Sequence, residues 1–178
     1  LMRTDNVTIA EAFKANGYET GHFGKWHLGD AWPMRPQDQG FDEVVGLRCG
    51  AISQIADYWG NDYFDDTYYH NGVPKKYEGY CTDVFFNETM HYIKQVKDKP
   101  FFVYLAPNVT HLPLKVADHY TQHHLANGVN EKLAVFYGMV DNLDENVGRL
   151  SAFLKQEGLD ENTIILFTTD DGTQGAAI

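Results

Sequence analysis

Short apolar runs that alternate with long helical patterns most constrain how this chain can fold. Residues 18–23 have the composition of a strand, and two further runs, 101–106 (Phe-Phe-Val-Tyr-Leu-Ala) and 163–169 (Thr-Ile-Ile-Leu-Phe-Thr-Thr), have apolar centres. An uninterrupted apolar run is typical of a strand with both faces buried. Because helical patterns separate these runs, we expect an α/β fold with a largely parallel sheet flanked by helices.

The helical patterns have identifiable starts and periods. Thr-Ile-Ala-Glu at residues 8–11 is a capping box for a helix over 9–16, with Ile9, Ala12 and Phe13 expected to face inward. A longer helix is predicted over 130–157, where apolar residues recur every three or four positions. They are Leu133, Phe136, Val140, Leu143, Val147, Leu150 and Leu154. This spacing favours a stripe that faces the core, and a coiled-coil seam is the weaker alternative.

Residues 57–80 are rich in tyrosine, with acids and glycines between the rings. Asn71-Gly72, flanked by Tyr68-Tyr69-His70 and Val73-Pro74-Lys75, predicts a tight hairpin. One interpretation is an antiparallel ribbon packed by its own aromatic side chains. The other is an aromatic wall that receives a sugar or aryl ring. The sequence leaves both open.

The composition limits the classes of partner. The chain has 178 residues, enough for one domain, and a formal net charge of −11, which argues against a nucleic-acid surface. No apolar run approaches the roughly 18 residues of a membrane span, and no basic-then-apolar leader opens the sequence. Cys49 and Cys81 do not form a C-x-x-C pair, and whether they form a disulfide is left open.

Polar residues that suit a catalytic site follow each strand-like run. Lys25 and His27 follow the first, His111 follows the second, and Asp170 and Asp171 follow the third. On an extended backbone Lys25 and His27 share a face, which suits binding and proton transfer at an oxyanion. Adjacent carboxylates suit a hard divalent cation, Ca²⁺ or Mg²⁺. Since ligands bind beyond the carboxyl ends of parallel strands, we expect these residues to converge at one edge of the sheet.

The chain also resembles the sulfatase family over nearly its whole length. The most specific element is Gly-Lys-Trp-His-Leu-Gly at 24–29. It is followed, in the family's order, by Gly-Phe-Asp at 40–42, Pro-Phe-Phe to His-Leu-Pro at 100–113, Leu-Asp-Glu-Asn-Val-Gly-Arg at 143–149, and Asn-Thr with the run into Asp170 at 162–170. The resemblance implies the alkaline-phosphatase-like α/β fold and a sulfuric ester hydrolase of the arylsulfatase type. It also implies a periplasmic, secreted or lysosomal location.

The resemblance implies a role for each site residue. Lys25 would bind the nucleophile and the sulfate oxygens, His27 would take a proton, and His111 would bind sulfate and protonate the leaving alcohol. Asp170 and Asp171 would bind Ca²⁺, with Mg²⁺ as the alternative. Position 171 is Asp where the family usually has Asn, which leaves the metal's identity open. The substrate would be a sulfate-ester small molecule or a sulfated glycan.

The family's nucleophile motif is absent from these residues. The nucleophile is a formylglycine made from a cysteine or serine in the motif Cys/Ser-x-Pro/Ala-x-Arg, whereas Cys49 precedes Gly-Ala-Ile-Ser and Cys81 precedes Thr-Asp-Val-Phe. We therefore predict that residues 1–178 are an internal part of a sulfatase catalytic domain and are inactive alone. A phosphoester or phosphonate hydrolase of the same superfamily, or a non-catalytic member, remains the alternative.

Overall fold

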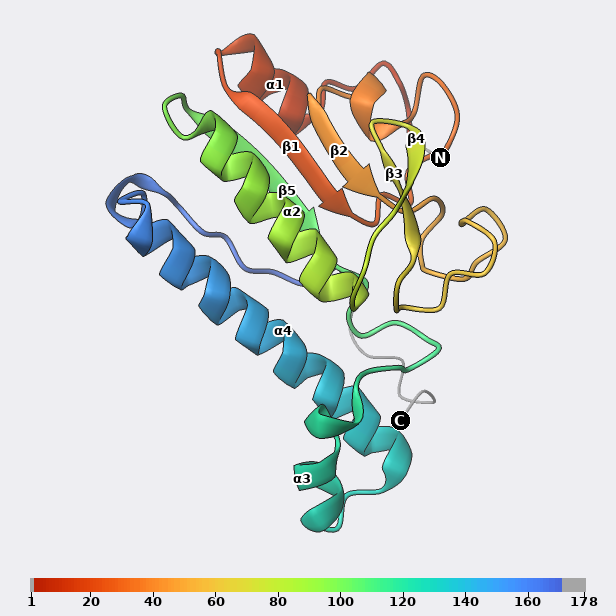
Figure 1. Ribbon diagram of the computed structural model, residues 1–178. Helices are drawn as coiled ribbons and strands as arrows, with labels where there is room; N and C mark the ends of the chain where they lie inside the picture. Colours follow the sequence, from red (N-terminus) through yellow and green to blue (C-terminus); the bar gives the residue numbers. More distant parts are fainter. Residues whose placement is uncertain (1, 171–178) are drawn as a thin grey trace. The chain divides into compact units, whose positions relative to one another are not determined.

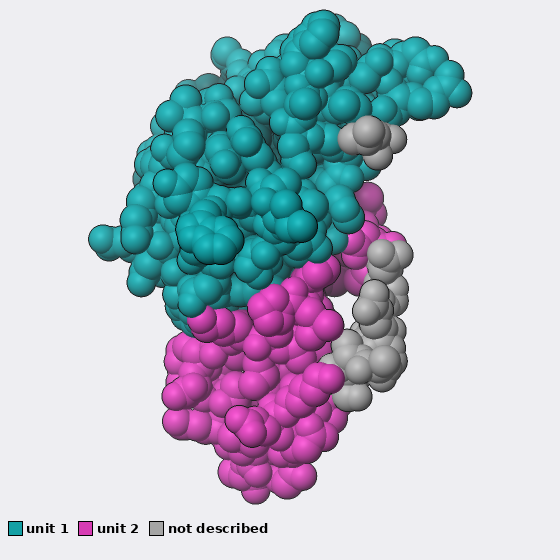
Figure 2. Space-filling model, turned by 90° about the vertical axis from the view of Figure 1, so that its right-hand side faces the viewer, with its two compact units in different colours: residues 1–108 teal, residues 109–178 magenta. Residues whose placement is uncertain are grey.

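A computed structural model describes residues 2–170. The chain divides into two compact units, 1–108 and 109–178 (Figure 2). Among the described residues, the first unit holds the five strands, the α-helices α1 and α2 and the short 3-10 helix η1. In chain order they are α1 (Ile9–Ala15), β1 (Glu19–Gly24), η1 (Pro36–Asp38), β2 (Glu43–Gly46), β3 (Thr67–His70), β4 (Val73–Lys76), α2 (Cys81–Val96) and β5 (Phe101–Ala106). The second holds η2 (Asp118–Tyr120), α3 (Gln122–Ala126), α4 (Glu131–Gln156) and η3 (Asp160–Asn162).

The strands form one five-stranded sheet in the order β4-β3-β2-β1-β5 (Figure 1). β1 pairs in parallel with both β2 and β5, and its pairing with β5 runs in register from Glu19↔Phe101 to Gly24↔Ala106. β3 and β4 add two antiparallel pairings, so the sheet is mixed. The predicted α/β class, with a sheet flanked by helices, is confirmed, and the expected parallel pairing holds for two of the four strand pairings.

The two faces of β1 show how the sheet becomes the middle of three layers. Gly21 and Phe23 face α2, where the Phe23 ring lies 5.7 Å from that of Tyr92. Thr20 and His22 point to the opposite face, where His22 meets the ring of Phe41 at 5.4 Å. Strand alternation thus places a helix on one face and the α1 and 26–41 segments on the other. Because Gly21 has no side chain, α2 can approach β1 closely: a Cβ at position 21 would lie 2.7 Å from the Tyr92 ring.

α1 begins at the predicted capping box. Thr8 accepts a hydrogen bond from the Glu11 N–H at 3.1 Å, and the Glu11 carboxylate accepts one from the Thr8 N–H at 2.7 Å. The predicted inward face is largely wrong: Ile9 is 64% exposed, Ala12 is exposed and Phe13 is half-buried, whereas Ala10, which was not predicted to face inward, is fully buried. A helix of seven residues has two turns, so a small rotation changes which residues meet the sheet.

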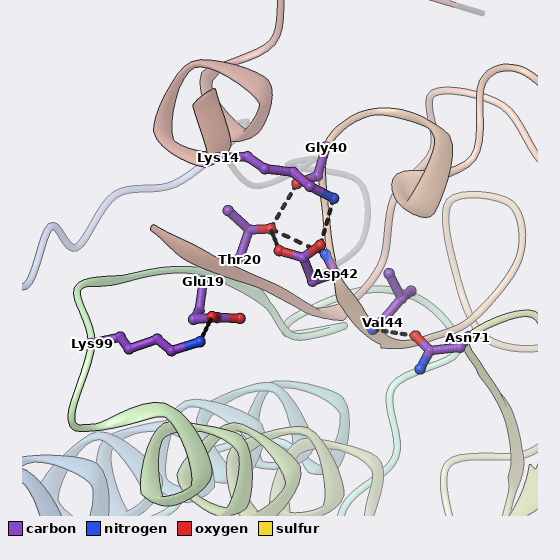
Figure 3. A network of polar contacts seen from close by, with 8 residues as sticks. All are labelled: Lys14, Glu19, Thr20, Gly40, Asp42, Val44, Asn71 and Lys99. Atoms are coloured by element: carbon purple, nitrogen blue, oxygen red, sulfur yellow. Dashed lines mark hydrogen bonds and ion pairs between the residues drawn. The ribbon is translucent and has the colours of Figure 1, made fainter. Parts of the chain in front are cut away.

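A network of polar contacts lies near the starts of β1 and β2 (Figure 3). The Thr20 hydroxyl lies 2.7 Å from the Gly40 carbonyl and 2.8 Å from Asp42 Oδ2, and it accepts the Asp42 N–H at 3.1 Å. Lys14 of α1 pairs with Asp42, and Lys99 pairs with Glu19. Burial alone would raise the pKa of Asp42, but the hydrogen bonds from Lys14 and Thr20 lower it below its usual range. The network therefore favours an ionised Asp42 that joins α1, β1 and the start of β2.

The predicted hairpin is confirmed, with β3 and β4 joined by Asn71 and Gly72. Both residues have positive φ, 50° and 87°, as a type I′ turn requires. The tyrosines around the hairpin serve packing, because Tyr63, Tyr68, Tyr77 and Tyr80 are all buried. Tyr58 and Trp59 are exposed instead, at 42% and 96%. The ribbon interpretation thus holds for the buried tyrosines, and the aromatic-wall interpretation stays a prediction for the exposed pair.

α4 forms where the 3.6-residue period predicts it, with Asn130 Oδ1 accepting the Leu133 N–H at 3.0 Å as its N-cap. The predicted core stripe is wrong in detail, because only Leu154 of that stripe is buried and Val140 is 41% exposed. The buried positions besides Leu154 are mostly small or amide residues, Ala134, Gly138, Asn142 and Asn146, together with Met139. Gly138 approaches the η2 backbone closely, since a Cβ there would lie 3.0 Å from the Tyr120 carbonyl oxygen. The apolar spacing predicted where the helix lies, but it did not predict which of its faces other elements cover.

The predicted buried strand at 163–169 is not present. Residues 163–169 do not form a strand, and the side chains of Ile164 and Leu166 are 96% and 87% exposed. A strand needs a neighbour to satisfy its backbone N–H and C=O groups, and the sheet described for residues 2–170 contains only β1 to β5. β5 was likewise predicted to be buried on both faces, yet it is half-buried, and its Tyr104 is 46% exposed. Among the described helices, none combines the length and the apolar character needed to cross a membrane.

Candidate active site

The Gly-Lys-Trp-His segment begins at Gly24, the last residue of β1, at the carboxyl edge of the parallel strands. Gly24 has a φ of 113°, and a Cβ there would lie 2.0 Å from the Ala106 carbonyl oxygen, so only glycine fits. The Lys25 N–H donates to that same carbonyl at 2.8 Å, and the Leu47 N–H donates to the Gly24 carbonyl at 3.3 Å. The ends of β1, β2 and β5 are thereby joined, and the backbone of Lys25 is held at the edge of the sheet.

The buried side chain of His22 contacts the backbone of this segment. His22 is fully buried, and its Nε2 lies 3.0 Å from the Lys25 carbonyl oxygen. A carbonyl only accepts, so Nε2 must carry the proton, and Nδ1 is left buried without a hydrogen-bond partner. Burial lowers the pKa of His22 to about 4, against the smaller opposite effect of the hydrogen bond to Lys25. The ring is therefore neutral near pH 7 and fixes the carbonyl of Lys25.

Sequence reasoning did not single out His22, although it lies within the same motif. Its signal was its place in the strand, two residues after Thr20, on the face opposite Phe23. Its surroundings are aromatic, with the rings of Trp26, Phe41 and Tyr104 at 5.4, 5.4 and 5.5 Å. Such an environment disfavours the charged form of the imidazole.

Trp26 anchors the segment between the two proposed catalytic residues. Its Nε1 donates to the Met34 carbonyl at 2.7 Å, and its ring packs against the cluster of Ala10, Phe41 and Val44. Lys25 is half-buried and His27 is exposed. Trp26 thus turns into the protein between two residues that reach solvent.

The extended backbone expected at His27 is not present. β1 ends at Gly24, and His27 has a φ of 57°, in the left-handed region. Strand alternation therefore does not orient Lys25 and His27. Gly50 determines the space around His27 instead, because a Cβ at position 50 would lie 2.3 Å from His27 Nδ1 and 2.6 Å from its Cγ.

The loop that carries Gly50 is held by side-chain acceptors. Asp30 Oδ1 accepts the Cys49 N–H at 2.9 Å, and Gln54 accepts the Gly50 N–H at 3.2 Å. Asp57 Oδ2 accepts the Ser53 N–H at 3.0 Å. These bonds fix a loop of irregular backbone against the imidazole of His27.

A small cavity of about 60 Å³ lies on the Trp26 side of the segment. Its polar lining includes Asp30, Arg35 and Arg48. Both guanidiniums have partners, since Arg35 forms two hydrogen bonds with Asp38, at 2.7 and 2.8 Å, and Arg48 lies 4.1 Å above the Tyr69 ring. Lys25 and His27 do not line this cavity, so we do not assign it to the candidate site.

The two cysteines are not paired, and Cys81 lacks the environment of a nucleophile. Both are free in the structure, so the open question of a Cys49–Cys81 disulfide is answered in the negative. Cys81 is fully buried at the start of α2, and burial raises the pKa of its thiol to about 12. A thiol with a raised pKa is a poor nucleophile near neutral pH.

His111 and Asp170 belong to the unit 109–178, whereas Lys25 and His27 belong to the unit 1–108. His111 is half-buried, and its Nδ1 lies 2.7 Å from the Leu112 carbonyl oxygen, which places a proton on Nδ1. Asp170 is exposed, and Asp171 lies outside the described residues. Convergence of all these residues at one edge stays a prediction.

The described residues supply at most part of a calcium shell. Ca²⁺ takes roughly six to eight oxygen ligands, and no group of three carboxylates, histidines or cysteines that includes Asp170 occurs within residues 2–170. The group of three that the described residues do form is His123, His124 and Asp141, whose nitrogen ligands do not suit Ca²⁺. The carboxylate of Asp170 offers the right donor atom without the rest of the set.

Comparison with known proteins identifies the family. The sulfatase family model matches residues 2–176, which is nearly the whole chain, and the chain belongs to the sulfatase family. An ulvan-active sulfatase from Formosa agariphila is 31% identical over 194 residues, which cover 96% of this chain and 36% of that protein. Mouse arylsulfatase J is 29% identical over 190 residues, which cover 97% of this chain and 30% of that protein. The chain thus spans about a third of these relatives.

Solved structures agree with the family at the level of the fold. The crystal structure of Ps i-CgsB in complex with k-i-k-neocarrahexaose superposes with a TM-score of 0.79 at 29% identity, covering 88% of this chain and 38% of that one. The PsFucS1 sulfatase from Pseudoalteromonas sp. has a TM-score of 0.66 at 23% identity, which shows the shared fold. The expected alkaline-phosphatase-like sulfatase fold is confirmed, in part of its length.

Proposed function

We propose that the protein to which these residues belong hydrolyses sulfate esters, and that Lys25, His27 and His111 act on the sulfate group. The observation that carries this proposal is the Gly-Lys-Trp-His segment, fixed after β1 by Gly24, His22 and Trp26 in a chain of the sulfatase family. Both compact units would then be parts of one catalytic domain.

Each residue has a role that its chemistry supports. The Lys25 ammonium binds sulfate and nucleophile oxygens through charge-assisted hydrogen bonds. His27, held by Gly50, takes a proton during breakdown of the sulfated nucleophile. His111, with its Nδ1 proton directed to the Leu112 carbonyl, would act in its imidazolium form: Nε2 gives its proton to the leaving alcohol and a neutral imidazole remains. These roles leave the nucleophile to be supplied, together with most of the metal ligands.

The nucleophile and most of the metal ligands come from outside these residues. A formylglycine derived from a cysteine or serine in the family's motif would attack sulfur, since Cys49 and Cys81 lack that motif. Asp170 and Asp171 would contribute carboxylate oxygens to a Ca²⁺ site, with Mg²⁺ as the alternative. When bound, the cation would offset negative charge on the sulfate oxygens.

A sulfated glycan is the substrate class that we favour. One of the similar structures holds a neocarrahexaose, and one of the relatives is described as ulvan-active. Exposed Trp59 and Tyr58 of the present chain offer flat rings of the kind that sugars stack on. An activated aryl sulfate is the practical alternative for assays.

The test compares the full-length protein, the 178-residue chain and single variants on an aryl sulfate and on a sulfated oligosaccharide. The full-length protein should hydrolyse both, and the 178-residue chain neither, because attack on sulfur needs the missing nucleophile. Lys25→Ala should lower kcat/KM by about 100-fold or more, as loss of an oxyanion-stabilising group does. Lys76→Ala, on exposed β4, is the matched control and should leave turnover unchanged.

His111→Ala separates the proposed roles further. Its loss should lower turnover most for substrates with poor leaving groups, because an activated phenol needs little protonation. Faster turnover of phosphate esters than of sulfate esters would instead indicate a phosphohydrolase. Turnover of neither by the full-length protein would indicate a non-catalytic member. Robust hydrolysis by the 178-residue chain would contradict the assignment of the nucleophile.

A further inference from the structure

Two histidines and a carboxylate meet in the unit 109–178, and none of the three is among the residues proposed for catalysis. His124 Nε2 lies 2.8 Å from Asp141 Oδ2, and His123 Nε2 lies 3.2 Å from the same oxygen. The three ligand atoms all fall within 4.8 Å of one another. One carboxylate oxygen therefore faces two imidazole nitrogens at once.

The cluster is fixed by the helices that carry it. His123 and His124 are adjacent on α3, with ring centroids 3.8 Å apart, and Asp141 lies on α4. The His124 side chain is 19% exposed and lies 5.3 Å from the Tyr137 ring. The His123 side chain is 56% exposed. One imidazole is thus held against α4, and the other leaves an entry path from solvent.

The donor set indicates which ion would fit. Two imidazole nitrogens and one carboxylate oxygen are typical of Zn²⁺ and neighbouring transition metals, whereas Ca²⁺ and Mg²⁺ prefer all-oxygen shells. Zn²⁺ sits about 2.0–2.2 Å from such atoms. Ligand atoms within 4.8 Å of one another can surround an ion at that distance with small side-chain rotations. A water molecule would complete a tetrahedral set.

We propose that His123, His124 and Asp141 bind Zn²⁺, and that the ion fastens α3 to α4. Two ligands come from α3, a helix of only five residues, and the third comes from α4. A helix that short has little stability of its own. A metal bridge to α4 would therefore order the 118–128 segment, and this role is independent of the sulfatase activity.

Calorimetric titration of the full-length protein with Zn²⁺, in the presence of excess Ca²⁺ to occupy oxygen sites, tests the proposal. The wild-type protein should bind Zn²⁺ with a Kd of about 10 µM or tighter, and His124→Ala and Asp141→Asn should each weaken binding by about 30-fold or more. His119→Ala is the matched control, since His119 lies in the same segment with its ring 4.0 Å from Tyr120 and outside the cluster. It should change the Kd by less than about threefold.

A second measurement does not depend on heats of binding. Co²⁺ in place of Zn²⁺ should give the visible absorption of a four-coordinate site in the wild-type and His119→Ala proteins, and lose it in Asp141→Asn. Excess Zn²⁺ should raise the thermal midpoint of the wild-type protein by about 5 °C and leave that of Asp141→Asn unchanged. Circular dichroism establishes that each variant is folded. Zn²⁺ affinity that is absent in the wild type, or that survives in both His124→Ala and Asp141→Asn, overturns the proposal and leaves the cluster as a hydrogen-bonded contact.

Discussion

β5 and the 163–169 segment have similar sequence patterns and different structures. Both follow a helix and centre on Phe, Leu and β-branched residues. β5 pairs with β1 through six successive residues, whereas Ile164 and Leu166 are almost fully exposed. The difference shows that apolar composition creates a candidate strand, and a neighbour with which to share backbone hydrogen bonds makes it one. β1 is that neighbour for β5.

The junction of β1 and β5 should be the most sensitive point in this comparison. Gly24→Ala places a Cβ 2.0 Å from the Ala106 carbonyl oxygen at a φ of 113°. We expect a loss of about 4 kcal/mol or more in the free energy of unfolding, because rigid backbone must move. Urea denaturation measures the loss.

Gly17→Ala is the matched control for Gly24→Ala. Gly17 also has a positive φ, 83°, but nothing lies within 4 Å of its would-be Cβ. Only the backbone strain remains, which costs about 1 kcal/mol. Equal losses for the two variants would show that strain at positive φ, and not contact with β5, dominates at Gly24.

The pH dependence of stability should report on His22. Its pKa falls from 6.5 in the unfolded chain to about 4 in the fold. Between these values the unfolded state binds a proton that the native state does not, so stability is full above pH 6.5 and is lost as the pH falls toward 4. The loss should reach about 3 kcal/mol at about 1.4 kcal/mol per pKa unit.

Denaturation curves from pH 7.5 to 4 measure this effect. His22→Phe should flatten the dependence, although it lowers stability at pH 7 by removing the hydrogen bond to Lys25. His91→Ala, on the exposed side of α2, should keep the slope of the wild type. A slope that persists in His22→Phe would assign the effect to other groups.

Leu105 of β5 and Leu166 of the 163–169 segment allow a direct comparison of a paired with an unpaired apolar run. Leu105 is half-buried in β5, so Leu105→Ala should cost about 2 kcal/mol. Leu166 is 87% exposed, so Leu166→Ala should change the free energy of unfolding by less than about 0.5 kcal/mol. The same denaturation assay compares them. Equal costs would contradict the difference in environment described for the two segments.

The smallest effect concerns two glycines of α4. A Cβ at Gly148 meets nothing within 4 Å, so Gly148→Ala should stabilise the protein by about 0.5–1 kcal/mol through helix propensity. Gly138→Ala should lose that gain or reverse it, because its Cβ would lie 3.0 Å from the Tyr120 carbonyl oxygen and 3.1 Å from Val116. Thermal unfolding measures both. Similar gains in stability for both variants would mean that the η2 backbone can move away from position 138 at little cost in free energy.

Local signals in the sequence predicted local structure well. The capping box at Thr8 and the Asn71-Gly72 turn each act over a few residues, and the elements they define lie where expected. The Gly-Lys-Trp-His motif singled out Lys25 and His27, whose roles stay a prediction. The left-handed φ of His27 was missed, because it depends on packing against Gly50, which lies 23 positions along the chain.

Burial was predicted less well because it depends on distant elements. Of the apolar stripe of α4 only Leu154 is buried, while Asn142 and Asn146 on another face are covered. His22 shows the reverse case, a titratable residue placed in an aromatic core by strand alternation. Neither outcome could be read from spacing alone, since spacing defines faces and tertiary neighbours decide which face is covered.

The side chain of Asn71 gives the hairpin a fixed length. Its Oδ1 accepts the Val44 N–H at 2.8 Å, its own N–H donates to the Val44 carbonyl at 2.8 Å, and its Nδ2 reaches Glu43 at 3.0 Å. Asp at this position would keep the turn and the first bond but lose the last, and set two carboxylates side by side. Insertion of one residue would move the amide away from Val44 and turn every following side chain of β4 to the other face. We therefore expect this turn to be a point at which insertions are not tolerated.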